Sequence, residues 1–389
     1  MMKKLCFVLS LFFFVLMQAQ NSNSYASTQI SILTFGPGTS LNDAFGHNGI
    51  RVKTAYNDIV YDYGRFPFND PNFYLNFARG KLLYSQGFSE YNQVINFYKS
   101  QNRTIKEQVL NLSVKEKQDM HNYLINNALP ENRDYLYDFF FDNCATKIRD
   151  VAEEITANDI VFHTPDNLGS HSFRDLIQQN LNWNSWGSLG IDVALGSIID
   201  RAATPYEYMF LPEYIHLFFE RATIKATNEK LVNQSLIINS VSEEEIANAF
   251  ISSPLFILGL ISLLILWITF KNYKNRRRSK WLDFTIFLVT GAIGVFILLL
   301  WFATDHTATA NNYNLLWASA LNVLLLNHVL KNTPSAWFVK YLKLLVILLC
   351  LLTFHWVLGV QGFAFALIPL LVALAIRYIY LVMYFSNDQ

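Results

Sequence analysis

The distribution of apolar residues divides this chain of 389 residues into two parts. Residues 21–253 have the composition of a soluble protein, whereas residues 254–385 are almost entirely apolar with short polar interruptions. An apolar run of about 20 residues is long enough to cross a bilayer as a helix. We therefore expect a soluble domain followed by an all-α membrane domain over residues 254–389.

Five apolar segments of the second part qualify as membrane-spanning helices. The third carries Asn322, Asn327 and His328, which makes it the most polar of the set. The expected spans are residues 254–270, 282–304, 313–330, 341–358 and 363–384.

The connecting loops indicate which way the spans face. Residues 271–280 carry lysine and arginine and residues 331–340 carry lysine, whereas loops 305–312 and 359–362 contain neither. Because basic loops stay in the cytoplasm, the first two should lie inside and the other two outside. The formal net charge is +0, so we interpret the basic run as a topology anchor and expect no nucleic-acid partner.

The first twenty residues have the features of a secretory signal peptide. Two lysines precede an apolar stretch from Leu5 to Leu16, and small or polar residues follow. This stretch is too short to span a bilayer comfortably. The soluble part should therefore be exported to the periplasm and held at the bacterial inner (cytoplasmic) membrane, with residues 1–20 as the signal.

The exported part is expected to begin with an α+β domain over residues 21–155. Alternating or apolar runs predict strands near 28–35, 48–54 and 58–63, and the capping box Ser113–Glu116 predicts a helix from 114 to about 127. Strands and helices come in groups, which favours a mostly antiparallel sheet. Residues 156–253 then form a helical extension and linker.

Cys144 is the only cysteine outside the hydrophobic segments. It directly precedes an amphipathic helix, whose N–H groups and dipole favour thiolate over thiol. An unpaired thiol in an oxidising compartment is a liability unless it has a chemical task. A buried free cysteine is the simpler interpretation, but compartment and position favour a nucleophile.

His47 is the candidate base for this thiol. It opens a strand in which His47, Gly49 and Arg51 share one face, and Asp62 on the neighbouring strand is placed to orient its imidazole. A histidine in a strand is also commonly structural. No pair of cysteine or histidine residues shows zinc-ligand spacing, so we expect no metal and no cofactor.

Several motifs resemble one known family. A strand histidine followed about a hundred residues later by Asn-Cys at a helix start is similar to the circularly permuted papain-like fold of the NlpC-like and lecithin:retinol acyltransferase families. A second set of motifs is more specific: Thr34–Gly38, Phe45–His47, Tyr61–Gly64, Asn72–Tyr74, Asp142–Thr146, Phe210–Pro212, Asp305–His306 and Asn314–Trp317. On these motifs the chain resembles the Lnb lipoprotein N-acyltransferases, although Asp62 stands where asparagine is commoner. The resemblance covers nearly the whole mature chain.

The resemblance implies a thiol-dependent acyltransferase. Cys144 would take a fatty acyl group from a membrane phospholipid, or from the diacylglycerol of the lipoprotein, with His47 as general base. A diacylated lipoprotein would then receive that group on the α-amine of its terminal lipid-modified cysteine. The residues expected to contact substrate are Asn143, Arg51, His306 and Asn311.

Two other functions remain open from the residues alone. A membrane-tethered cysteine peptidase or amidase of the cell wall would use the same Cys144 and His47 pair. A non-enzymatic envelope scaffold would merely pack both side chains. For His306 and its neighbours, a hydrated loop that simply collects polar residues is the competing explanation.

Overall fold

The computed structural model describes residues 25–66, 71–241 and 250–387, so the predicted signal peptide lies outside the described residues. The chain forms two compact units. The sheet unit contains residues 25–66, 71–74, 81–169 and 203–241, and the helical unit contains residues 75–80, 170–202 and 250–387. An α+β domain followed by a helical membrane region confirms the predicted fold class.

A seven-stranded sheet in the order β6-β4-β3-β2-β1-β5-β9 forms the centre of the sheet unit. All of its neighbouring strands pair antiparallel, as predicted. The strands are β1 (Gln29–Phe35), β2 (His47–Lys53), β3 (Asp58–Arg65), β4 (Leu83–Glu90), β5 (Ile105–Leu110), β6 (Asp134–Leu136) and β9 (Val232–Asn239).

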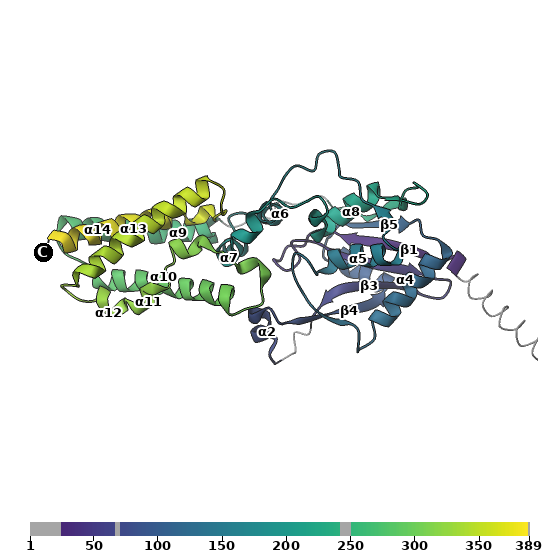
Figure 1. Ribbon diagram of the computed structural model, residues 1–389, viewed down its shortest axis with the longest axis horizontal. Helices are drawn as coiled ribbons and strands as arrows, with labels where there is room; N and C mark the ends of the chain where they lie inside the picture. Colours follow the sequence, from purple (N-terminus) through teal and green to yellow (C-terminus); the bar gives the residue numbers. More distant parts are fainter. Residues whose placement is uncertain (1–24, 67–70, 242–249, 388–389) are drawn as a thin grey trace, which may run out of the picture. The chain divides into compact units, whose positions relative to one another are not determined.

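Helices pack against this sheet (Figure 1). On one face, Tyr98 of α3 stacks on Phe35, with ring centroids 3.8 Å apart. On the other face, buried Asn48 bonds to Thr34 and to the backbone of Pro212, where α8 begins. The helices of this unit are α3 (Tyr91–Ser100), α4 (Val114–Asn127), α5 (Cys144–Ile155) and α8 (Pro212–Arg221), with the 3-10 turn η2 (Glu207–Phe210). A small second sheet pairs β7 (Ile160–Val161) with β8 (Thr223–Ile224).

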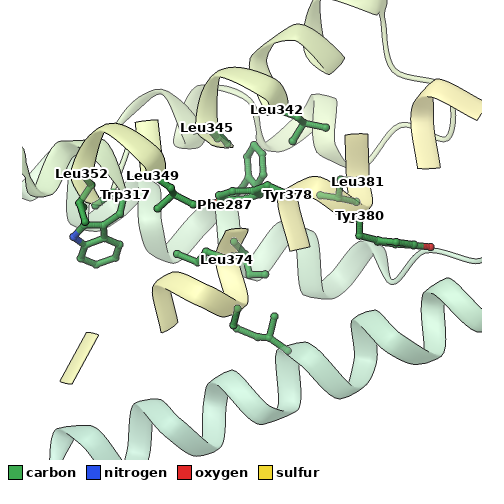
Figure 2. Close-up of a cluster of buried hydrophobic side chains, with 14 of the residues drawn as sticks. Phe287, Trp317, Leu342, Leu345, Leu349, Leu352, Leu374, Tyr378, Tyr380 and Leu381 are labelled. Carbon is green, nitrogen blue, oxygen red and sulfur yellow. The ribbon is translucent and has the colours of Figure 1, made fainter. Parts of the chain in front are cut away.

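Among the described residues, four helices of the helical unit are long and apolar enough to cross a membrane. They are α9 (Pro254–Lys274), α10 (Lys280–Phe302), α13 (Ala336–Val357) and α14 (Ile368–Asn387), the last preceded by the short turn η6 (Phe365–Leu367). Figure 2 shows how side chains of α10, α13 and α14, including Phe287, Leu345 and Tyr378, enclose a buried apolar core with Trp317.

The prediction that residues 313–330 form one membrane-spanning helix is corrected by the structure, in which these residues are not one continuous helix. It consists of η5 (Tyr313–Leu316), α11 (Leu321–Leu324) and α12 (Leu326–Val329). Its polar groups bind neighbouring helices: Asn322 donates to Thr290 of α10 and accepts from Tyr341 of α13. Irregular backbone is tolerated at membrane depth when protein surrounds it. This explains why an apolar segment that was predicted to be one spanning helix forms several short helical segments instead.

The predicted extension, residues 156–253, divides between the two units instead of forming one linker. Residues 203–241 return to the sheet unit and supply β9. Residues 170–202 belong to the helical unit and form α6 (Phe173–Gln178), α7 (Trp186–Ala194) and the 3-10 turn η1 (Ser197–Asp200). Buried Arg174 holds this region together through ion pairs with Asp192 and Asp200 at 2.9 and 2.8 Å.

Candidate active site

Cys144 is the first residue of α5, at the helix N-terminus that the sequence predicts. The preceding Asn143 caps the helix: its side-chain oxygen accepts from the N–H groups of Ala145 and Thr146 at 2.8 and 2.9 Å. The cap does not take the N–H of Cys144 itself. The residue as a whole is partly exposed, as a reactive cysteine usually is.

His47 begins β2, and its imidazole lies close enough to Cys144 for the two side chains to shift each other's pKa. Its Nε2 lies 3.4 Å from Oδ2 of Asp62 in β3. Phe35 stacks beside the imidazole, with ring centroids 6.3 Å apart, and limits its rotation.

The register of β2 and β3 explains why these side chains meet. Gly49 pairs with Asp62, so His47 lies two positions along on the same face as Asp62, a diagonal pair within reach of an imidazole. Near the end of β3, Gly64 has a φ of +93°. A side chain is disfavoured at that conformation, and a Cβ added there would lie 4.0 Å from the Cβ of Cys144.

Arg65 is a site residue that the sequence did not predict. Its Nε donates to Oδ1 of Asp62 at 2.6 Å, so Asp62 bridges His47 and Arg65. In a regular strand, residues three apart point to opposite faces. The register shift between Asp62 and Arg65 removes that restriction. In the sequence, Gly64 between these two residues is the feature that could have predicted such a bulge.

Electrostatics at the site favour a thiolate beside a protonated imidazole. Burial alone would raise the pKa of the Cys144 thiol, but the His47 charge, its hydrogen bond and the backbone N–H of Asn48 outweigh burial and lower that pKa. Burial would likewise lower the pKa of His47. The nearby Tyr98 and Cys144 and hydrogen bonds to Asp62 and Cys144 outweigh it, so the His47 pKa is raised. Burial pushes the pKa of Asp62 up, but His47 and Arg65 bring it below its usual value.

Two of the predicted substrate contacts are engaged within the sheet unit. Arg51 is buried, pairs with Asp58 and Glu107 at 2.6 and 2.8 Å, and stacks over Tyr91. Asn143 is also buried, and besides its capping bonds it donates to the carbonyls of Phe139 and Phe210. These contacts give both residues a place in the fold, and their contact with substrate stays a prediction.

His306 and Asn311 belong to the helical unit. His306 follows α10, and its Nε2 lies 3.0 Å from the carbonyl oxygen of Phe77. Asn311 is exposed and has a φ of +56°, and its carbonyl accepts from the N–H of Ser197. Substrate contact by these two residues also stays a prediction. Within the part of the chain that the structure describes, no three His, Cys, Asp or Glu side chains gather to hold a metal ion.

The fold and this arrangement define a membrane protein whose α+β domain carries a Cys–His–Asp constellation. A family model described as the Lnb N-terminal periplasmic domain matches residues 16–179, and one described as the Lnb transmembrane domain matches residues 245–388. The chain belongs to the Lnb family, and its sheet unit is a periplasmic domain. No curated protein and no solved structure matches it significantly.

Proposed function

We propose that the chain is a thiol-dependent acyltransferase that N-acylates the terminal lipid-modified cysteine of bacterial lipoproteins. The observation that carries the proposal is the contact of Cys144 with His47, itself held by Asp62, in a chain of a lipoprotein N-acyltransferase-like family. The lowered pKa of Cys144 supports a nucleophilic role, because the thiolate is the attacking species.

The first half-reaction transfers an acyl group to the enzyme. The Cys144 thiolate attacks the ester carbonyl carbon of a membrane phospholipid or of a diacylglycerol group, and the new C–S bond forms. The C–O bond of the ester breaks, and protonated His47 gives its proton to the departing alkoxide. The products are a thioester on Cys144, a lysolipid and neutral His47.

The second half-reaction passes the acyl group to the acceptor. The α-amine of the terminal lipid-modified cysteine of a diacylated lipoprotein attacks the thioester carbonyl and loses a proton to His47. The C–S bond breaks, an amide is formed, and the thiolate–imidazolium pair is restored.

Three features of the site suit this chemistry. The N–H of Cys144, which Asn143 does not cap, is positioned to donate to the oxyanion of each tetrahedral intermediate. Asp62 keeps the imidazole oriented and favours its protonated form. The membrane helices hold the enzyme where both of its lipid substrates reside. We place the protein in the bacterial inner membrane on this reasoning.

The experiment that tests the proposal measures N-acylation of a diacylated lipopeptide by the full-length protein in phospholipid vesicles, using mass spectrometry. Cys144→Ser should lower the rate by roughly 10³-fold or more, as removal of a nucleophile does. The matched control is Cys350→Ser, which replaces the exposed free cysteine of α13 and should leave the rate unchanged.

Either of two results would overturn this function. One is a Cys144→Ser variant that acylates at the wild-type rate. The other is a wild-type protein that cleaves peptidoglycan fragments through Cys144 but never acylates the lipopeptide, which would make it a cell-wall peptidase or amidase.

A further inference from the structure

The short helix α2 (Phe73–Arg79) presents apolar side chains to its surroundings. Tyr74 is 80% exposed, and Leu75 and Phe77 are each 54% exposed. Only Phe73 of this helix is buried. Such a concentration of exposed apolar side chains on one short helix marks an interaction surface rather than ordinary solvent-facing sequence.

Residues 75–80 belong to the helical unit although they lie between β3 and β4 of the sheet. Two backbone carbonyls of this segment are bound by residues of the loop after α10. The N–H of Asp305 donates to the carbonyl of Arg79 at 2.9 Å, and Nε2 of His306 lies 3.0 Å from the carbonyl of Phe77. The rings of Phe77 and His306 also meet edge to face, with centroids 6.4 Å apart.

The position of that loop brings α2 to the membrane surface. The candidate span α10 ends at Phe302, which is 72% exposed, and Asp305 follows three residues later. Three residues reach at most about 10 Å. Adding the 2.9 Å hydrogen bond, the carbonyl of Arg79 lies within about 13 Å of the end of this candidate span. The charges of the loops put that end on the periplasmic side.

We propose that α2 lies in the membrane interface, with Tyr74, Leu75 and Phe77 inserted among the phospholipids of the periplasmic-side leaflet. Aromatic rings are enriched at this depth, where an apolar body and a polar tip both find partners. A helix with exposed aromatic and leucine side chains binds there through the apolar area that it buries. Arg79 at the C-terminal end is exposed and suited to a lipid phosphate.

The test places an environment-sensitive fluorophore on Leu75→Cys in the full-length protein, after Cys6, Cys144 and Cys350 have been replaced by serine. The protein is reconstituted in vesicles of phosphatidylethanolamine and phosphatidylglycerol, with or without lipids that carry a spin-label quencher. Tyr56→Cys is the matched control, because Tyr56 lies in the β2–β3 turn and is 90% exposed. Replacing Cys144 makes the result independent of the proposed activity.

The probe at Leu75 should emit at shorter wavelength than the probe at Tyr56, and lipid-borne quencher should reduce its intensity at least about twofold. Iodide in the buffer should quench only the Tyr56 probe. Equal iodide quenching of both probes, with no effect of the lipid quencher, would overturn the proposal. So would a Leu75 probe that is protected from both quenchers, since that result means that protein covers the helix.

Discussion

His47 and Asp62 join two neighbouring strands through a contact of 3.4 Å between Nε2 and Oδ2, and Asp62 in turn accepts from Arg65 at 2.6 Å. The imidazole thereby reaches Cys144 from a fixed direction. An imidazole held in this way needs no rearrangement before it exchanges a proton with a reacting group.

Removing His47 should suppress the reactivity of the thiol. His47→Ala takes away the positive charge and hydrogen bond that lower the pKa of Cys144, so burial then raises that pKa and the thiolate fraction at pH 7 falls. Alkylation by iodoacetamide at pH 7 should slow several-fold, because the thiolate is the reacting species. The midpoint of the rate against pH should move upward.

This measurement uses a protein in which Cys6 and Cys350 are serine. His121→Ala is the control, because His121 bonds the hydroxyl of Tyr25 and is not part of the site. Identical pH profiles for His47→Ala and the parent would show that the imidazole does not activate the sulfur.

Asn143→Ala should destabilise the start of α5. The substitution removes the cap on Ala145 and Thr146 and leaves the buried carbonyls of Phe139 and Phe210 without this donor. We expect a loss of roughly 2–4 kcal/mol, more than for an exposed cap. The measurement is hydrogen exchange of the α5 amides. The control is Ser113→Ala at the exposed cap of α4, which should lower the stability of α4 by only about 1 kcal/mol. Equal effects at the two caps would argue against this structural role.

Arg174→Ala should loosen α6 and α7. It leaves the buried carboxylates of Asp192 and Asp200 without their cation, and breaking such a buried pair costs roughly 3–5 kcal/mol. Faster hydrogen exchange across both helices would report the change. Arg221→Ala is the matched control, because this arginine pairs with Asp166 at the surface. Surface ion pairs contribute at most about 1 kcal/mol to stability. Unchanged exchange in Arg174→Ala would contradict the assigned contacts.

Gly294→Ala should destabilise the packing of residues 313–330 on α10. A Cβ at Gly294 would lie 2.1 Å from the carbonyl oxygen of Ala318, so backbone must shift. Overpacking of this kind costs roughly 1–3 kcal/mol. The midpoint of thermal unfolding in detergent should fall. Gly259→Ala on α9 is the control, since nothing lies within 4 Å of its Cβ position. A Gly294→Ala protein as stable as the control would show that this contact is absent.

Local chemistry made much of the sheet unit predictable. The capping box Ser113–Glu116 starts α4 at Val114, as the sequence predicts. The predicted amphipathic helix begins at Cys144, although Asn143 was not predicted to be its cap. The diagonal placement of His47 and Asp62 follows from strand alternation once their hairpin is recognised. These features depend on residues close together in the chain.

The features that the sequence did not predict depend on residues that are far apart in the chain. β9 carries mostly polar or exposed side chains at the sheet edge, so its sequence lacked the alternation of a half-buried strand. Residues 170–202 join the helical unit through contacts such as that of Gly362 with Asp200, 162 positions apart. The partners of Arg51, Glu107 and Tyr91, come from β5 and α3, which no local sequence pattern links to β2.

The most direct test of the central claim is the intact mass of the wild-type protein after incubation with phospholipid in the absence of an acceptor. The account predicts an added fatty acyl mass on Cys144 that hydroxylamine removes and that a diacylated lipopeptide discharges, with release of an N-acylated product. It predicts no such adduct on the Cys144→Ser protein and an undiminished one on Cys350→Ser. N-acylation that proceeds while Cys144 never carries an acyl group would contradict it.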